Sequence, residues 1–474
     1  MQSHTIPPFP LLLFLLLLVS FLLSTHQQPP LDPSEQESVY IALEMINSVV
    51  PWRVLFPDDL CLSAPHGIVC DYFPDDHDDH ISGGSTHVVE LSFGFVSDYS
   101  PNPPCLENST FPSSAAALPR LRKLFFYRCF TGMAVQFPEF GSGSLGFTSL
   151  EELVLIENPA LVGKINGTVL GGLSRLRRLV LSGTNLTGTI PDEIGQLSNL
   201  EHLVISNSPL DGLVPSSVGQ LSKLRVLDMN HIGLTGPVPE SIGHLGMLIK
   251  LDLSWNRLVG EIPDTIKKLK TLELLDLGHN QFGNFGIPVF LGEMPLLKEI
   301  HLSGNNELGG QIPEIWDNLG GLIGLGFSSI GLVGEIPTSM GLFLRNLSYI
   351  ALDNNTLVGT LPKELELIST LHEMNLQNNK LSGKVPFSAE FVHGIGTKLR
   401  LEGNTELCLD KGLLVHDKKK HVLGPVWLRS FRLCNGSEKD NSALMNKGSC
   451  LGGFWGLRVM LWGSFGLLVQ LLVL

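Results

Sequence analysis

Leucine recurs along most of the chain at fixed intervals, with polar or small residues between the leucines. From residue 150 onward the motif L-x-x-L-x-L, with conservative replacements, returns every 24 to 26 residues. Its ten copies begin at Leu150, Leu176, Leu200, Leu224, Leu248, Leu272, Leu297, Leu322, Leu347 and Leu371. Alternate residues of a strand point to opposite sides, so L-x-L predicts a short strand with leucines inside and the x positions in solvent. One turn cannot bury these leucines alone, so the repeats must stack.

The period and the motif together are typical of leucine-rich repeats. An Asn follows most of the predicted strands, at Asn158, Asn256, Asn280, Asn305, Asn355 and Asn379. We expect this amide to satisfy backbone groups in the turn. The position is taken in four repeats by Thr184, Ser208, Ile232 and Ile330. Isoleucine cannot replace the amide, so we expect looser turns there, or backbone groups satisfied in another way.

The predicted fold is an α/β solenoid, a leucine-rich-repeat superhelix with disulfide-stapled caps at both ends. Residues 150–395 form the ten repeats. Residues 31–130 are the expected N-terminal cap, with an atypical leading repeat at Leu121, and residues 396–436 the C-terminal cap. The N-terminal cap should contain an amphipathic helix with apolar positions at Val39, Ile41, Leu43, Ile46 and Val49.

Both ends of the chain are strongly apolar. Residues 1–26 read as a signal peptide, because the apolar run from Leu11 to Leu23 has only 13 residues and is too short to span a bilayer. After a linker at residues 437–450, the tail 451–474 fits either a glycosylphosphatidylinositol signal or a single membrane span. Attachment would fall at Asn441 or Ser442. Both interpretations anchor the protein through this tail to the extracellular face of the plasma membrane, and a plain secreted protein is the third.

Cysteine and sequon content fits the secretory pathway. The six candidate disulfide residues are Cys61, Cys70, Cys105, Cys129, Cys408 and Cys434. Proximity in the chain favours pairing them in this order, although the sequence alone does not decide the connectivity. Candidate glycosylation sites are Asn108, Asn166, Asn185, Asn346, Asn354 and Asn435.

Composition narrows the possible functions. Charged residues make up 16% and hydrophobic residues 43% of the chain, which is not a disordered composition. The net charge of −14 argues against nucleic acid as a partner. No phosphate loop, zinc-protease motif or nucleophile elbow stands out, so we expect neither enzymatic activity nor a cofactor. The acidic stretch 71–80 is interpreted as a solvated loop and not as a metal site.

Four blocks in the caps carry a more specific signal than the repeats. They are Pro51 to Cys61, His66 to Asp71, Lys123 to Phe130 and Lys398 to Cys408. Together they resemble plant leucine-rich-repeat receptor-like proteins of the Piriformospora indica-insensitive type, and more distantly Too Many Mouths. The L-x-G-x-I-P form of the repeats, as at Gly260-Glu-Ile-Pro263, also resembles plant extracellular repeats. The resemblance implies a twisted solenoid with a second, smaller set of strands. It also implies a receptor-like protein without a kinase domain, acting beside receptor kinases in development or in the response to microbes.

Candidate binding residues come from the positions that face the concave surface. In L1-x-x-L4-x-L6-x-x-N9 these are positions 3, 5, 7 and 8. Position 8 holds His231, Trp255 and His279 in three adjacent repeats, and position 5 holds Asp228, Asp252, Asp276 and His301 in four. The rings could anchor a secreted peptide or a receptor-kinase ectodomain, and the carboxylates could attract a basic partner. The alternative is structural, with the aromatics packing on neighbours and each Asp bonding to nearby groups. An alternative function is an extracellular inhibitor of microbial cell-wall-degrading enzymes, of the polygalacturonase-inhibiting type.

Overall fold

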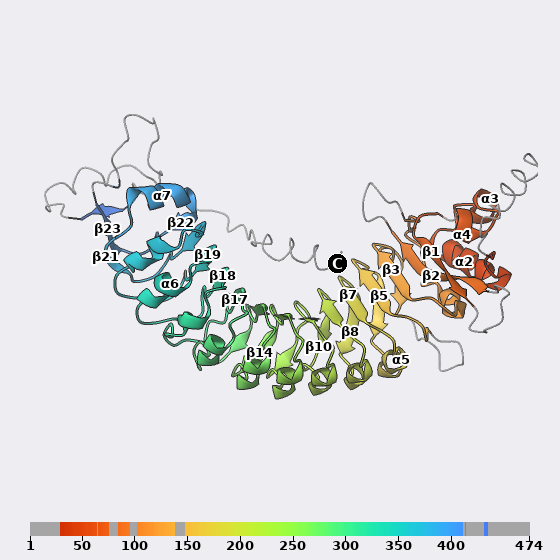
Figure 1. The fold of residues 1–474 in the computed structure, drawn as a ribbon, viewed down its shortest axis with the longest axis horizontal. Coiled ribbons are helices and arrows are strands. Elements are labelled where there is room, and N and C mark those ends of the chain that lie inside the picture. The colour runs from red at the N-terminus through yellow and green to blue at the C-terminus, as the bar shows by residue number, and fades with distance from the viewer. Residues whose placement is uncertain are drawn as a thin grey trace, which may run out of the picture.

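The computed structural model describes residues 29–63, 65–74, 84–94, 102–137, 147–410, 413 and 431–434. The predicted signal peptide, linker, tail, attachment sites Asn441 and Ser442, and sequon Asn435 lie outside these residues, as do residues 75–80 of the acidic stretch. Figure 1 shows an arc whose inner side is a long sheet and whose outer side is a row of short helical segments. Within the described part of the chain, no helix combines the length and the apolar character needed to cross a bilayer.

The inner sheet has 14 strands, and each of the ten predicted repeats contributes one of them. In spatial order these are β1 (Ile68–Pro74), β2 (Gly84–Phe93), β3 (Lys123–Tyr127), β5 (Glu152–Ile156), β7 (Arg178–Ser182), β9 (His202–Ser206), β11 (Val226–Asp228), β13 (Lys250–Asp252), β15 (Leu274–Asp276), β17 (Glu299–His301), β18 (Gly324–Gly326), β19 (Tyr349–Ala351), β20 (Glu373–Asn375) and β22 (Leu399–Arg400). Only β1 is antiparallel to its neighbour. Position 5 of one repeat therefore lies beside position 5 of the next, as Asp228 pairs with Asp252.

A second, smaller set of strands lies beside the main sheet, as the resemblance implied. It forms β4 (Val135–Gln136), β6 (Leu161–Lys164), β8 (Asn185–Thr189) and β10 (Leu210–Asp211), then β12 (Thr235–Gly236), β14 (Arg257–Gly260) and β16 (Gln281–Phe282), and finally β21 (Ser382–Lys384), β23 (Glu406–Leu409) and β24 (Arg432–Leu433). The interruptions follow from the Gly-x-x-Pro stretch, because Pro fixes φ and gives no N–H to a ladder.

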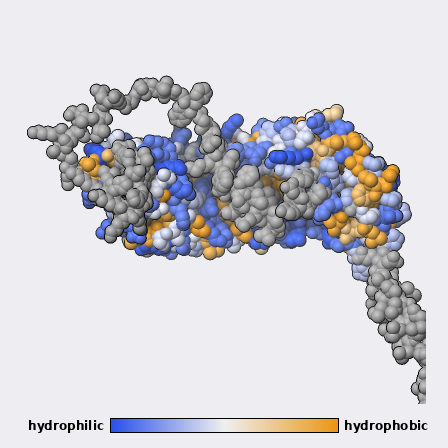
Figure 2. Space-filling view, turned by 90° about the horizontal axis from the view of Figure 1, so that it is seen from above, coloured by the Kyte–Doolittle hydropathy of each residue, from blue (hydrophilic) through white to orange (hydrophobic). Residues whose placement is uncertain are grey.

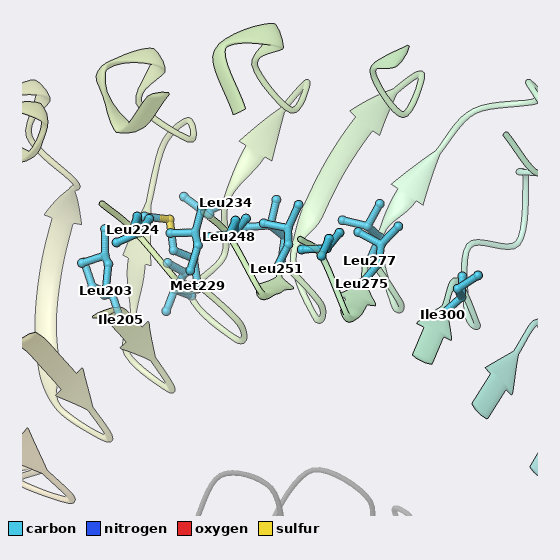
Figure 3. Packing of buried hydrophobic residues seen from close by; sticks show 14 of the residues in the cluster. Leu203, Ile205, Leu224, Met229, Leu234, Leu248, Leu251, Leu275, Leu277 and Ile300 are labelled. Carbon is cyan, nitrogen blue, oxygen red and sulfur yellow. The ribbon is translucent and has the colours of Figure 1, made fainter. Parts of the chain in front are cut away.

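Short helical segments complete each turn on the outer side. They are η1 (Ser113–Ala117), α5 (Gly167–Gly172), η2 (Asp192–Gln196), η3 (Ser216–Gln220), η4 (Glu240–His244), η5 (Asp264–Lys268), η6 (Val289–Glu293), η7 (Trp316–Asn318), α6 (Thr338–Phe343), η8 (Lys363–Leu367), α7 (Ala389–Ile395) and η9 (Gly396–Lys398). Between them and the sheet, the repeat leucines are buried in one continuous core. Figure 3 shows Leu203, Leu251 and Leu275 in a row along that core, one from each of three repeats, so each repeat covers the leucines of the next.

The Asn after each strand ties consecutive turns together. Asn256 Nδ2 donates to the carbonyl oxygen of Met229 (2.7 Å) in the preceding repeat. Its Oδ1 accepts from the backbone N–H groups of Ile232 (3.3 Å) and Leu234 (2.9 Å). The turn that lacks its own Asn is thus satisfied by the Asn of the next repeat, and Asn355 does the same for Ile330 (3.1 Å). The second of the two expected outcomes, satisfaction in another way, is the one observed.

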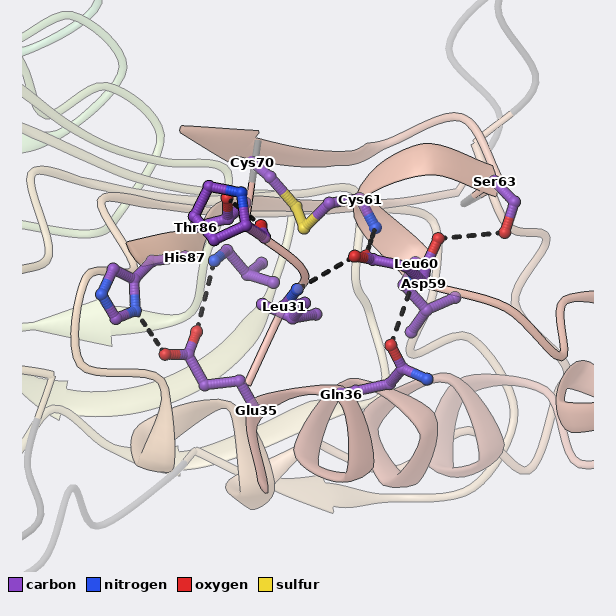
Figure 4. The surroundings of a disulfide bond; sticks show 12 residues. Leu31, Glu35, Gln36, Asp59, Leu60, Cys61, Ser63, Cys70, Thr86 and His87 are labelled. Atoms are coloured by element: carbon purple, nitrogen blue, oxygen red, sulfur yellow. Dashed lines mark hydrogen bonds and ion pairs between the residues drawn. A yellow bond between two sulfur atoms is a disulfide. The ribbon is translucent and has the colours of Figure 1, made fainter. Parts of the chain in front are cut away.

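The N-terminal cap is built on α2 (Pro33–Ile46), which begins after Asp32. Its buried apolar side includes Val39, Leu43 and Ile46, as expected. Two expected members were wrong, because the side chain of Ile41 is exposed and Val49 lies beyond the end of the helix. Figure 4 shows the Cys61–Cys70 disulfide and the polar contacts around it, among which the hydrogen bond between buried Glu35 of α2 and His87 of β2 fastens the helix to the sheet.

All six candidate disulfide residues are paired in the order that proximity favoured. Cys61–Cys70 joins α4 (Leu60–Ser63) to β1, Cys105–Cys129 closes the leading repeat, and Cys408–Cys434 closes the far end. The expected C-terminal cap also contains one more turn of the solenoid. Its Leu399 and Leu401 are buried, and Asn404 bonds to the carbonyl oxygen of Leu376 (2.8 Å), continuing the Asn ladder.

Candidate binding surface

The position-8 rings of three repeats form one stack on the concave side. The ring centroids of His231 and Trp255 lie 4.9 Å apart, and those of Trp255 and His279 lie 3.7 Å apart. Both pairs are close to parallel, with interplanar angles of 17° and 16°. The structure thus brings together the three residues that the sequence placed in one column, and their rings pack on one another as the structural alternative expected. Their role in binding a partner stays a prediction. We call these three residues the ring ladder.

The backbone of the ring ladder is left-handed. The φ angles are 52° at His231, 57° at Trp255 and 53° at His279. This conformation is the rule at position 8, where Gly183 and Gly304 also have positive φ. For residues with a side chain it costs roughly 1–2 kcal/mol, and a bulky residue such as Trp is a rare occupant. Stacking of the three rings offsets part of this cost.

The ring ladder presents edges, not faces, to a partner. Each face of the Trp255 indole is covered by an imidazole, and 39% of Trp255 is exposed. Burial lowers the pKa of both His231 and His279, so the flanking rings are neutral near pH 7. The surface available to a partner is thus a ridge of uncharged ring edges with polar nitrogens.

The position-5 carboxylates do not form the open acidic stripe that was one of the two interpretations. Asp228 is 1% exposed and Asp252 is 4% exposed. Lys250 at position 3 lies between them, with its Nζ 2.7 Å from Asp228 Oδ2 and 3.4 Å from Asp252 Oδ2. The structural interpretation, in which each Asp bonds to nearby groups, describes these two residues. A free stripe is ruled out because the carboxylates are neutralised from within the sheet.

Asp276 differs from the other two carboxylates. Leu274 holds the position that Lys250 occupies in the preceding repeat, so no lysine bridges toward Asp276. Its Oδ1 accepts from the N–H of Gly278 (2.9 Å), and the side chain stays partly accessible from the concave side. Burial, together with the charge of Asp252, raises the pKa of Asp276 to about 7. Its charge therefore changes close to neutral pH.

His301 belongs to a cluster with two residues that the sequence analysis did not select. His301 Nε2 lies 3.0 Å from Glu299 Oε2 and 2.9 Å from the Tyr349 hydroxyl. Burial alone lowers the pKa of His301, but the bond to Glu299 and the carboxylate of Asp276 raise that pKa above its usual value. Tyr349 reaches across the sheet because Gly324 has no side chain, and a Cβ there would lie 2.3 Å from the Tyr349 ring. Reading position 3 as a column would have shown Lys250, Glu299 and Tyr349.

The described sequons lie on different sides of the molecule. Asn354 occupies position 8 on the concave side, where its Oδ1 accepts from Asn378 Nδ2 (2.8 Å). Asn166 caps α5, Asn185 begins β8, Asn346 lies in the turn before β19, and Asn108 lies in the N-terminal cap. Their glycosylation stays a prediction. Among the described residues, no three His, Cys, Asp or Glu side chains are grouped as a metal ion would require.

The fold and its period are those of leucine-rich repeats. The family model described as Leucine Rich Repeat matches residues 175–197, 199–221 and 247–269. The ectodomain of the Arabidopsis thaliana receptor kinase GASSHO1/SCHENGEN3, solved in complex with CASPARIAN STRIP INTEGRITY FACTOR 2, has a TM-score of 0.59 at 24% identity over 78% of this chain and 47% of that one. The PEPR1–AtPEP1 structure has a TM-score of 0.55 at 22% identity, over 80% of this chain and 59% of that one. These likenesses show the fold.

The sequence relatives, all from Arabidopsis thaliana, include receptor-like proteins and receptor-like kinases. Receptor like protein 29 is 36% identical over 180 residues, which are 37% of this chain and 36% of that protein. Protein TOO MANY MOUTHS is 37% identical over 147 residues, 31% of this chain and 27% of the relative. Piriformospora indica-insensitive protein 2 is 31% identical over 157 residues, 33% and 34% of the two chains. The matches span about a third of each relative, and they confirm the resemblance to plant leucine-rich-repeat receptor-like proteins.

Proposed function

We propose that this chain is a cell-surface receptor-like protein whose concave face binds a secreted peptide or the ectodomain of a leucine-rich-repeat receptor kinase. The observation that carries the proposal is the ring ladder, three adjacent rings held on left-handed backbone. The relatives support the class, since they include Receptor like protein 29 and Receptor-like protein 53. Two ectodomains of the same fold were solved with a peptide hormone or an integrity factor bound.

The presence of three rings at a position that glycine or asparagine fills more easily favours a binding role for the ring ladder. Glycine or asparagine adopts this conformation at lower cost, and either would complete the turn equally well. Gly183, Asn207 and Gly304 do so at the same position of nearby repeats. The left-handed backbone itself belongs to the fold, since Arg128, Glu157 and Ser329 adopt it at the equivalent position. What distinguishes these three repeats is the rings placed on it. Rigid aromatic rings also lose little conformational entropy when a partner covers them.

The neighbouring charges indicate what the partner should bring. Asp276 is accessible without a lysine bridge, and the His301–Glu299–Tyr349 cluster lies one repeat further along the sheet. A partner that fits this surface has an apolar group for the ring edges and hydrogen-bonding groups for Asp276 and His301. A glycan on Asn354 would cover the repeats beyond this cluster and leave the three ring-bearing repeats as the open surface.

The remaining parts of the proposal concern where the protein is located and how its signal enters the cell. We infer that the signal peptide is removed and that the tail 451–474 anchors the protein to the outer face of the plasma membrane. The binding protein itself would have no enzymatic activity, and the receptor-kinase partner would carry the signal inward.

The test is affinity capture of partners from intact membranes with the wild type, Trp255→Ala and a matched control. Phe285→Ala is the control, because Phe285 is an aromatic residue with 61% exposure that lies outside the concave sheet. Receptor-kinase capture that Trp255→Ala abolishes and Phe285→Ala preserves is the expected result. Equal capture by Trp255→Ala would refute the placement on the ring ladder. Recovery of a pectinase in place of a kinase would support the inhibitor function.

A further inference from the structure

We propose that an exposed apolar surface on the N-terminal cap docks a basic, amphipathic segment of a second protein. This surface, called the cap patch, consists of Val49, Val54, Leu55 and Leu62, which are 76%, 76%, 58% and 77% exposed. It belongs to the Pro51 to Cys61 block and its neighbours, which the concave site does not use. The inference goes beyond the proposed function, since the cap patch is separate from the ring ladder.

The apolar side chains point outward because their helices are fixed from the other side. Trp52, the first residue of α3 (Trp52–Leu55), is buried and donates from Nε1 to the carbonyl oxygen of Asn47 (2.7 Å). Val54 and Leu55 of the same turn are left in solvent. Leu60 in the same way anchors α4 and leaves Leu62 outside. Only residues 56–59 separate the two helices in the chain.

The surface view agrees with this placement. Figure 2 shows hydrophobic surface gathered at the end of the molecule that the N-terminal cap forms. Single exposed apolar residues are normal, but a group of four large ones in 14 consecutive residues, 49–62, is typical of an interaction site. The core does not require these side chains, because Trp52 and Leu60 already fill it.

The charges around the cap patch decide which partner fits. Residues 31–65 contain six acidic residues, of which Glu35 is buried and Asp32, Glu37, Glu44, Asp58 and Asp59 are at least partly exposed, and one basic residue, Arg53. Arg53 is already paired with Glu37 (2.6 Å) and Glu44 (2.8 Å). A second copy would bring another acidic rim against this one, and an anionic membrane surface would be repelled. An apolar segment flanked by Lys or Arg can bury the apolar side chains of the cap patch and pair with the acidic residues around it.

A pair of designed peptides tests the proposal on the full-length protein. The probe is an 18-residue amphipathic helix of Leu and Lys, and its counterpart carries Glu at each Lys position. The protein variants are Val54→Ser/Leu62→Ser, which keeps the net charge, and Val289→Ser, which removes an apolar residue with 69% exposure outside the cap. Fluorescence anisotropy should show at least tenfold weaker Leu/Lys binding by the double variant, and unchanged binding by Val289→Ser. The Leu/Glu peptide should bind at least tenfold more weakly than the Leu/Lys peptide.

Unchanged Leu/Lys binding by the double variant would overturn the proposal, because the attraction would then be general electrostatics. Two other possible occupants of the cap patch, a second copy of the chain and a membrane, are each tested by a separate measurement. A dimer in sedimentation velocity that the double variant abolishes would identify a self-interface. Patch-dependent flotation with phosphatidylcholine vesicles would identify a membrane site, and either result overturns the proposal. Should the double variant fail to fold by circular dichroism, Val49→Ser replaces it with the same expectations. Trp255→Ala should keep Leu/Lys binding, which separates this test from that of the concave site.

Discussion

Lys250 illustrates how one residue alters the chemistry of the concave face. It is 7% exposed and bridges two carboxylates from adjacent strands, which lie side by side in the parallel sheet. Burial alone lowers the pKa of Lys250, but Asp228 and Asp252 raise it above its usual value, so the side chain is charged. Without this cation, the two buried carboxylates would repel each other in a medium of low dielectric. Lys250 therefore stabilises the repeats that also carry the ring ladder.

Replacing Lys250 with Met tests this role. We expect the free energy of unfolding at pH 8 to fall by about 3–5 kcal/mol, because removing one partner leaves buried charges without compensation. Burial already raises the pKa of Asp228 to about 6 from 3.8. The folded pKa lies above the unfolded one, so ionisation of Asp228 costs stability as pH rises from about 3.8 to about 6. Without Lys250, whose charge lowers this pKa, Asp228 stays protonated to higher pH, so the loss in the variant should be smaller at pH 5 than at pH 8. Urea unfolding at both pH values measures the effect.

Lys298→Met is the matched control for this substitution. Lys298 also pairs with a carboxylate, Glu273, at 2.7 Å, but both side chains are well exposed. Exposed pairs contribute at most about 1 kcal/mol, so this variant should remain near the wild type at both pH values. Equal losses from the two substitutions would show that burial of the Lys250 pair has no special effect.

At the scale of the element, each turn depends on the Asn of its own repeat and on that of the following one. Asn256 accepts hydrogen bonds from two backbone N–H groups of the turn that carries Ile232. Asn280 accepts from one, the N–H of Leu258 (3.0 Å). Both amides donate to three carbonyl oxygens each. Because position 232 holds Ile and not Asn, Asn256 of the following repeat accepts the additional hydrogen bond from this turn.

Alanine at Asn256 should consequently cost more than alanine at Asn280. Each buried group left unpaired costs about 1–3 kcal/mol, and Asn256→Ala leaves one more of them. We expect both variants to be destabilised, with Asn256→Ala the worse by about 1 kcal/mol. Denaturant midpoints of the two variants, measured side by side, provide the comparison. A larger loss in Asn280→Ala would contradict the idea that Asn256 serves the isoleucine turn.

At the scale of the whole molecule, stability is distributed from repeat to repeat. Each strand contacts its two neighbours in the sheet, and the ends are closed by the caps. In such an array an end that loses its cover opens locally without disturbing distant repeats. The Cys408–Cys434 disulfide holds β24 against β23 at the C-terminal end. The ring ladder lies several repeats away from it.

Removing this disulfide should therefore lower the local stability of the C-terminal end only. For Cys408→Ser/Cys434→Ser we expect a loss of roughly 2–4 kcal/mol in the stability of the last turns. Hydrogen exchange followed by mass spectrometry should show faster exchange in residues 373–409 and unchanged exchange in residues 226–276. Binding at the ring ladder should survive. Faster exchange throughout the chain would instead show that the solenoid unfolds as one cooperative unit.

Several features of the molecule follow from the sequence alone. The leucine period determined the stacked turns, because a strand that buries alternate residues must pair with equivalent strands. The same period placed His231, Trp255 and His279 in one column, so their meeting was predictable. The cap cysteines were close enough in the chain for their pairing to be favoured in advance.

Only the tertiary structure decided what those columns present to a partner. The carboxylates of Asp228 and Asp252 look like an acidic stripe in the sequence, yet Lys250 from a neighbouring column neutralises them. Tyr349 contacts His301 across two repeats because Gly324 between them leaves room for its ring. Charge and exposure depend on which side chains reach across the sheet. Periodicity determines which positions are neighbours, whereas packing determines which of their groups remain open to a partner.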